Sequence, residues 1–275
     1  MDKEMFAYWR SRSTAAYHFP MDADIWQRSM EEDTDSDGRL LFDDLTTREI
    51  RADGKICSMI QYGRTAFGFD DSGEISPAIH HSVIRTLIFD DPAAGNTLLQ
   101  AAMTALGNKE RIYAFFHYFG MSACARHGKL HESYPQVQKL LMENGFAVEH
   151  ENIYYSRMLQ ADDGENTAIH LEWKPISKGD CREFAALNGE TEVGWGQVHF
   201  LPQKNIAYLR WVYIDEKQQH QGYGTGTMKA LFAELYANGI RRFDTDTALN
   251  NTIAQAFYEK NGFKNEGITR SYYTK

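Results

Sequence analysis

Cysteine is scarce in this chain, and the few that occur form no recognisable pattern. Only three are present among 275 residues, Cys57, Cys124 and Cys181. Their spacing fits neither a disulfide framework nor a zinc site. Cys181 also lies outside every motif described below, so we expect it to be a small buried residue and not a nucleophile.

Long apolar runs are absent as well. No stretch approaches the roughly 20 consecutive apolar residues that a membrane-spanning helix needs. The first residues, MDKEMFAYWRSRS, lack the apolar centre of a secretory signal. The composition is nevertheless 43% hydrophobic and 13% aromatic, which is ample material for a buried core. We therefore expect a soluble cytoplasmic protein of one or two domains, with no membrane partner.

Positive charge is in the minority. The 29 Lys and Arg against 38 Asp and Glu give a net charge of −9, which argues against a general nucleic-acid binder. Residues 201–275 carry 10 Lys or Arg against 7 Asp or Glu, a balance of +3, so the remainder carries −12. The C-terminal part is thus the better place for an anion, although a solvated surface explains so small a bias almost as well.

Two stretches of the chain resemble each other. LLMENGFAVEHENIYYSR begins at Leu140, FYEKNGFKNEGITRSYYTK begins at Phe257, and their Asn-Gly-Phe triplets align. Each combines a helical apolar pattern, a glycine suited to end a helix, and a strand-like run with paired tyrosines. We interpret the pair as a duplication; the alternative is chance, because helix–glycine–strand endings are common.

The polar segment ADDGENTA (161–168) is the best domain boundary, so the sequence predicts domains of residues 1–160 and 161–275. The first domain begins with aromatic-rich helical sequence. A hairpin turning at Asp53-Gly54, the strand VIRTLIF and the helix TLLQAAMTAL follow. The second has strands in EVGWGQVHFL and IAYLRWVYI around a turn at 202–205, and then helix, strand, helix and strand. Strands that alternate with helices predict an α/β fold with some parallel pairing.

A glycine-rich loop, QQHQGYGTG (218–226), lies between the predicted strand IAYLRWVYI and a helix. The apolar residues of that helix form one stripe: Met228, Leu231, Phe232, Leu235 and Tyr236. A loop at this place offers free N–H groups beside the positive end of a helix dipole, which favours a phosphate. The spacing excludes the Rossmann and Walker A glycine motifs. A tight turn without a ligand remains the alternative.

A second motif decides between these interpretations. Gln219-x-x-Gly222-x-Gly224 is followed about 30 residues later by NTIAQAFYEKNGF, with Asn251, Ala254 and Tyr258. In this order the two motifs resemble the signatures of the GNAT superfamily of acyl-CoA-dependent N-acyltransferases. The resemblance is clear over 206–275 and extends plausibly over 168–205.

The resemblance implies a fold and a site. It implies two GNAT-like domains, each with a mixed, largely antiparallel twisted sheet flanked by helices and containing a splayed pair of parallel strands. Acetyl-CoA amides are expected to pair with the backbone of Val212, Tyr213 and Ile214. The pyrophosphate is expected on the amides of the loop residues: Gln219, His220, Gln221, Gly222, Tyr223, Gly224 and Thr225. Asn251 is expected to contact the pantetheine arm, and Tyr258 to lie near the sulfur as general acid.

The implied chemistry is direct attack of a neutral amine on the thioester, without an acyl-enzyme. The general base is not evident, because the strand leading into the loop offers only Arg210 where many relatives carry a carboxylate. Glu192, His199 and Asp246 are candidates, and a water relay is the alternative.

The first half looks like a decayed copy. Aligning the two Asn-Gly-Phe triplets places Leu141 opposite Tyr258, so this copy lacks the acid. After its strand it reads DDPAAGNTLL, where Gly95 stands alone and two aspartates would repel phosphate. We expect a GNAT-related domain without a cofactor site.

An acidic segment, DTDSDGRLLFDD, matches a calcium loop in Asp33, Asp35, Asp37, Gly38 and Asp44. Position twelve is usually glutamate and a strand follows instead of a helix, so we favour an acidic surface turn and expect no metal.

The sequence therefore predicts an acetyl-CoA-dependent N-acetyltransferase acting on a primary amine of a small molecule. A non-catalytic acyl-CoA sensor or scaffold is the alternative, and a fully degenerate structural protein is a third. A homo-oligomer is compatible with the sequence.

Overall fold

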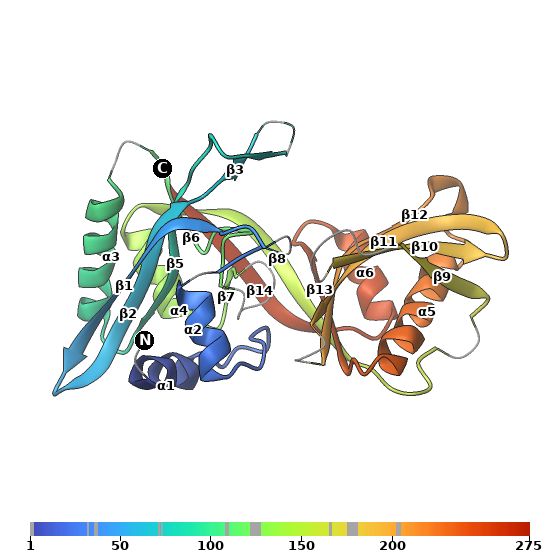
Figure 1. Cartoon of the computed structure of the whole chain (residues 1–275), viewed down its shortest axis with the longest axis horizontal. Coiled ribbons are helices and arrows are strands. Elements are labelled where there is room, and N and C mark those ends of the chain that lie inside the picture. The colour runs from blue at the N-terminus through green and yellow to red at the C-terminus, as the bar shows by residue number, and fades with distance from the viewer. Residues whose placement is uncertain are drawn as a thin grey trace. The chain divides into compact units, whose positions relative to one another are not determined.

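The computed structural model describes residues 3–31, 33–35, 38–70, 72, 74–107, 110–121, 128–164, 167–174, 181–201 and 205–275. The chain divides into two compact units (Figure 1). Unit 1 comprises Met1–Asn152 and Gly267–Lys275, and unit 2 comprises Ile153–Glu266. This division differs from the predicted boundary at residue 161. The reason is that two long strands, β8 (Phe146–Met158) and β14 (Lys264–Thr274), contribute residues to both units.

Unit 1 begins with two helices and continues as an α/β unit. In chain order its elements before β8 are α1 (Lys3–Arg12), α2 (Ala23–Glu31), β1 (Phe42–Ala52), β2 (Lys55–Thr65), β3 (Gly68–Phe69), β4 (Ile75–Ser76), β5 (Ser82–Phe89), α3 (Pro92–Leu106), β6 (Ile112–Ala114), β7 (Leu130–His131) and α4 (Pro135–Glu143). Its sheet runs β1-β2-β5-β6-β14, and only the β5–β6 pair is parallel. The predicted turn between β1 and β2 is confirmed, since Asp53 and Gly54 both have positive φ.

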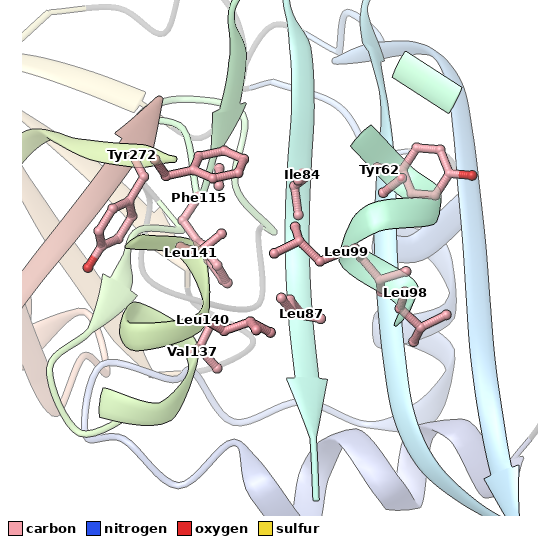
Figure 2. Packing of buried hydrophobic residues seen from close by; sticks show 14 of the residues in the cluster. Tyr62, Ile84, Leu87, Leu98, Leu99, Phe115, Val137, Leu140, Leu141 and Tyr272 are labelled. Carbon is pink, nitrogen blue, oxygen red and sulfur yellow. The ribbon is translucent and has the colours of Figure 1, made fainter. Parts of the chain in front are cut away.

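Helices cover both faces of the sheet in unit 1. Ile60 and Tyr62 of β2 share a buried cluster with the leucines of α3. Figure 2 shows side chains of β5 between those leucines and the leucines of α4. The intervening Gln61 points to the opposite face, where its side-chain nitrogen donates to the Met30 carbonyl of α2 at 2.7 Å. Buried Arg85 of β5 donates to the Ser29 carbonyl at 2.6 Å, so α2 is tied to this second face.

Unit 2 repeats the later part of this order. Its elements are β9 (Ile169–Trp173), β10 (Cys181–Asn188), β11 (Thr191–Leu201), β12 (Ile206–Ile214), a 3₁₀ turn η2 (Glu216–Gln218), α5 (Tyr223–Ala237), β13 (Arg242–Ala248) and α6 (Thr252–Lys260). The strand order is β8-β13-β12-β11-β10-β9, and β12 and β13 are parallel. Of the predicted apolar stripe of α5, all but Tyr236 are buried. The predicted turn over 202–205 falls largely outside the described residues.

The parallel strands diverge in both units. In unit 2 the β12–β13 ladder ends at Tyr208 and Asp244, although β12 continues to Ile214. In unit 1 the β5–β6 ladder ends at Ile84 and Ala114. The first strand of each parallel pair, β12 or β5, also carries one extra residue relative to its antiparallel neighbour. In both strands this residue lies just beyond the point where the parallel ladder ends. These features confirm the predicted fold class of mixed sheets with a splayed parallel pair.

The two segments that resemble each other in sequence also end their helices in the same way. Asn144 ends α4 and Asn261 ends α6, and each is followed by a glycine of positive φ, 85° at Gly145 and 77° at Gly262. A left-handed residue at this place is the expected helix stop. Among the described residues, no helix combines the length and the apolar composition needed to cross a membrane.

Candidate functional site

A cleft of about 550 Å³ lies in unit 2 at the end of β12, beyond the last pair of the β12–β13 ladder. It gathers most of the residues that the sequence singled out. The predicted residues that line it are Val212, Tyr213, Ile214, Gln219, His220, Gly222, Gly224, Thr225, Asn251 and Tyr258. Two motifs about 30 residues apart therefore meet at one site.

The N-terminus of α5 opens into this cleft without a side-chain cap. The N-cap residue is Gly222, with φ 86° and ψ −5°, and within the described part of the chain no side chain caps the first amides. The first intrahelical hydrogen bond runs from the Gly226 nitrogen to the Gly222 carbonyl at 2.9 Å. The amides before Gly226 thus lack an intrahelical acceptor, and they lie at the positive end of the helix dipole. This arrangement suits a phosphate group.

The three glycines of the loop are required for different structural reasons. Gly222 is needed for its left-handed backbone, and a Cβ there would meet nothing within 4 Å. At Gly226 a Cβ would lie 2.8 Å from Ile169 of β9, so this glycine lets α5 pack closely on the sheet. At Gly224 a Cβ would lie 3.1 Å from the Phe257 ring.

Tyr258 lies on α6 and is 8% exposed. Its hydroxyl is hydrogen-bonded to Thr245 of β13. Burial raises the pKa of Tyr258, the hydrogen bond with Thr245 offsets part of this effect, and the nearby Asp246 carboxylate raises the pKa further. The phenol is therefore protonated at neutral pH, as a proton donor must be.

Asn251 has a structural task that the sequence analysis did not foresee. It is the N-cap of α6, and its side-chain oxygen accepts from the Ala254 nitrogen at 3.1 Å. Such a cap stabilises a helix by about 1 kcal/mol. Only the side-chain NH₂ group is left to donate toward the cleft, because the oxygen is already engaged.

The three candidate bases lie in different places. Glu192 is exposed on β11, and His199 lies on the same strand near its other end. Asp246 lies on β13 beyond the divergence, where it accepts a hydrogen bond from the Tyr208 hydroxyl at 2.6 Å and acts on the pKa of Tyr258. None of the three lines the cleft, and Asp246 is the one that lies close enough to Tyr258 to act on its pKa.

Some predicted residues are not brought to the cleft, and others were missed. The Gln221 side chain donates to the Lys217 carbonyl at 2.9 Å, and the Tyr223 hydroxyl accepts from Asn188 at 3.2 Å, so neither side chain lines the cleft. The further lining residues all come from α6: the motif residue Ala254, and Ile253, Phe257 and Lys260, which the sequence analysis did not name. Their spacing around Tyr258 is that of one helix face, which is the signal that would have found them.

A second hollow of about 480 Å³ shares Thr225 and Lys260 with the cleft. Its lining also includes Lys229 of α5 and Arg157 of β8. Arg157 donates to the Asn261 carbonyl at 2.6 Å and pairs with Asp163, so it is engaged within unit 2. The two lysines add positive charge beside the uncapped end of α5.

The corresponding end of α3 in unit 1 is filled by the chain itself. The Asp91 carboxylate accepts from the Ala93 and Ala94 nitrogens at 3.2 and 3.1 Å, and thereby caps the helix. Its neighbour Asp90 pairs with Arg12 of α1. Leu141, opposite Tyr258 in the alignment, is fully buried in the core (Figure 2).

The acidic loop of unit 1 has partners of its own. Asp33 pairs with buried Arg85, and Asp35 accepts from the Arg39 side chain at 2.8 Å. Asp44 accepts from the Arg64 backbone nitrogen at 2.8 Å. Asp33 is itself buried, so "surface turn" does not describe it, and Asp37 lies outside the described residues. Within the described residues, no three His, Cys, Asp or Glu side chains gather as metal ligands do.

Comparisons with known proteins indicate the family of this part of the chain. The acetyltransferase (GNAT) family model matches residues 146–263. The ribosomal protein bS18-alanine N-acetyltransferase of Haemophilus ducreyi is 37% identical over 60 residues, which are 22% of this chain and 41% of that enzyme. A GCN5-related glucosamine N-acetyltransferase region of a fungal multi-domain β-N-acetylglucosaminidase superposes with a TM-score of 0.62 at 11% identity, over 98% of this chain and 36% of that one.

A tandem GNAT protein from the clavulanic acid biosynthesis pathway superposes with a TM-score of 0.52 at 11% identity, over 84% of this chain and 82% of that one. This chain thus spans less than half the length of the curated relative and of the fungal protein. At such identities the superpositions establish the fold, and the family model identifies the domain. Residues 146–263 form a domain of the GNAT acetyltransferase family.

Proposed function

We propose that unit 2 is an acetyl-CoA-dependent N-acetyltransferase that acetylates a primary amine of a small molecule. The observation that carries this proposal is the single cleft lined by the divergent end of β12, the uncapped N-terminus of α5 and the protonated Tyr258. A phosphate site, an open strand edge and an acid next to each other are what acyl transfer from a CoA thioester needs.

The residues divide the work of binding. The pyrophosphate lies on the free amides between Gly222 and Thr225, and Lys229 and Lys260 supply positive charge beside it. The free edge of β12 at Val212–Ile214 pairs with the amides of the pantetheine arm, and one of these N–H groups polarises the thioester carbonyl. The Asn251 NH₂ group donates to the same arm. The Asn251 oxygen stays on α6.

Acetyl-CoA supplies an activated acetyl thioester. The neutral amine attacks its carbonyl carbon, so that a C–N bond forms and the C–S bond breaks. Tyr258 donates its phenolic proton to the departing sulfur. Asp246, directly or through a water molecule, takes the proton that the amine nitrogen loses. Before the next cycle Asp246 releases this proton to solvent and Tyr258 regains one from solvent.

Unit 1 is, in this proposal, a GNAT-related domain that has lost its cofactor site. Asp91 occupies the amides on which a pyrophosphate would lie, and the Asp90–Arg12 pair stands beside it. The acid position holds Leu141. Three cysteines and no disulfide pattern suit a reducing compartment, and we propose the cytoplasm.

The alternative is a non-catalytic acyl-CoA-binding module. It is favoured by Arg210, which stands on β12 where many relatives carry a carboxylate. Tyr258 and its raised pKa favour the enzyme, because a sensor has no use for a buried phenol poised at the cleft.

A thiol-release assay with acetyl-CoA and a panel of amines tests the proposal. The panel includes glucosamine, 2-phenylethylamine, putrescine and a short peptide with an N-terminal alanine, because the neighbouring proteins act on glucosamine and on an alanine. We expect turnover with at least one small amine. Tight binding of acetyl-CoA without turnover on the whole panel would favour the sensor, and turnover of the peptide alone would move the acceptor to a protein.

A further inference from the structure

One face of the sheet in unit 2 carries large aromatic side chains in the open. Trp195 of β11 is 41% exposed, and Trp211 and Tyr213 of β12 are 60% and 41% exposed. Trp195 lies directly opposite Tyr213 in the antiparallel ladder, and their ring centroids are 6.4 Å apart. Single exposed aromatics are ordinary, whereas three on adjacent strands of one face are not. We name Trp195, Trp211 and Tyr213 the aromatic face.

The aromatic face points away from α5. Ile214 lies beneath Gly224 of α5, and alternation along β12 puts Val212 on the same side. Trp211 and Tyr213 therefore point to the opposite side. Tyr213 also lines the cofactor cleft, so the aromatic face is continuous with the place where the thioester is expected.

Unit 1 has equivalent ladder positions, and they hold other residue types. Its ladder pairs Met59 with Ile88 and Gln61 with Thr86, as unit 2 pairs Trp195 with Tyr213 and Gln197 with Trp211. The unit 1 residues are therefore the counterparts of the aromatic face.

The unit 1 face is covered from within the chain. Met59, Gln61 and Thr86 are at most 5% exposed. Thr86 and Ile88 line a cavity of about 250 Å³ that Trp9 and His18 help to form. In unit 1 the N-terminal segment thus provides the aromatic groups over this face. In unit 2 the strands carry the aromatic groups themselves, at positions where unit 1 has methionine, threonine and isoleucine.

We propose that the aromatic face is the acceptor platform of the transferase, and that it selects primary amines attached to a ring. Flat apolar faces stack on tryptophan and tyrosine, whereas a flexible linear chain gains less from them. A protonated amine approaching the platform is also attracted by the ring faces. Amino sugars and arylalkylamines share this chemistry. The inference rests on the proposed function, because it supplies the acceptor for that site.

The test compares Trp211→Ala and Trp211→Phe with the wild type, and Met158→Ala serves as control because Met158 is 65% exposed on β8 of unit 2. The acceptors are glucosamine, 2-phenylethylamine and linear putrescine, each with saturating acetyl-CoA. Tryptophan fluorescence measures acceptor binding independently of turnover, and calorimetry measures acetyl-CoA binding.

We expect at least one ring-bearing amine to quench the fluorescence and to be acetylated. Its KM should rise about three- to tenfold in Trp211→Ala and recover in Trp211→Phe, because a stacked ring contributes about 0.5–1.5 kcal/mol. The affinity for acetyl-CoA and the turnover of putrescine should not change. Met158→Ala should match the wild type throughout.

Two results would overturn the inference while leaving the transferase intact. The first is turnover of putrescine only, with no binding of either ring-bearing amine. The second is a dimer in analytical ultracentrifugation that Trp211→Ala dissociates, which would assign the aromatic face to a second copy of the chain. If the wild type does not bind acetyl-CoA, that result would instead contradict the proposed function itself.

Discussion

The two units place the same structural elements around a diverging pair of strands, and they differ in what fills the opening. In unit 2 the helix that follows the first strand of the pair, α5, begins at Gly222 without a side-chain cap, and Tyr258 lines the cleft. In unit 1 the equivalent helix is capped by Asp91, and the position of the phenol holds the buried Leu141. One opening is left for a ligand, and the other is closed by the chain.

This difference teaches where the capacity to bind an anion resides. A helix N-terminus attracts negative charge in either unit, since both helices expose their first amides at the same place. What decides is whether a carboxylate of the chain already satisfies those amides. We expect the capping aspartate to stabilise unit 1 and, by the same contacts, to keep a phosphate from those amides.

The largest effect is expected at the acid. Tyr258→Phe keeps the ring and removes the proton donor, and turnover should fall about a hundredfold, since general acid catalysis contributes about 10²–10⁴. Binding of acetyl-CoA should persist. Steady-state kinetics and calorimetry on the same preparation measure both quantities, and an unchanged kcat would remove Tyr258 from the mechanism. Because the pKa of Tyr258 is raised, deprotonation of its phenol should not lower the wild-type kcat at any pH below 10.

The stability of unit 1 should fall in acid because of a buried histidine. Burial lowers the pKa of His18 from 6.5 to about 4. Between these two pH values the imidazole is therefore protonated in the unfolded chain and neutral in the folded chain. The stability is complete above pH 6.5 and declines as the pH falls toward 4. From pH 7 to pH 5 the contribution of this group falls by about 2 kcal/mol. Urea unfolding of the wild type and of His18→Phe measures it. Parallel pH dependence in both proteins would show that His18 is not responsible.

Converting the open helix end into the closed kind should weaken cofactor binding. Gly222→Asp places a carboxylate at the N-cap position that Asp91 holds in unit 1, and the affinity for acetyl-CoA should drop about tenfold because this negative charge repels the pyrophosphate beside the helix end. Gly222→Asn is the matched control, because asparagine has the same shape, tolerates positive φ and carries no charge. If both variants bind acetyl-CoA equally well, the charge at this helix end is not what matters.

The smallest effect is expected from the reverse change. Asp91→Ala removes the cap of α3 and should destabilise unit 1 by about 1 kcal/mol, whereas Asp91→Asn, which keeps an accepting oxygen, should cost less. Urea unfolding gives both values. Acetyl-CoA affinity and stoichiometry should stay as in the wild type. The appearance of a second binding event in Asp91→Ala would mean that the site of unit 1 is masked and not lost.

Local patterns predicted much of this fold. The hairpin at Asp53-Gly54 and the helix stops before Gly145 and Gly262 follow from residues whose backbone preferences are strong, and all are confirmed. The position of the last strand does not follow. Residues 267–275 belong to unit 1 because Tyr272 and Tyr273 pair with β6, more than 150 residues earlier, and no local preference encodes such a partner.

The site was predicted as a set of motifs, and the structure changes the part that individual residues play. Motif spacing indicated Gly222 and Tyr258 together. It did not distinguish the backbone role of Gly222 from the packing role of Gly226, since both depend on neighbours in space. The exposure of Trp211 could not be predicted either: its strand pattern resembles that of a buried strand, and the described residues leave it 60% exposed, whereas its counterpart Thr86 in unit 1 is covered.

The central claim is that only unit 2 holds acetyl-CoA, and calorimetric stoichiometry tests it most directly. Titration of the full chain with acetyl-CoA should give one molecule per chain, with an affinity that Gly222→Asp lowers and Asp91→Asn leaves unchanged. Two molecules per chain, or one molecule whose affinity Gly222→Asp does not alter, would contradict the account.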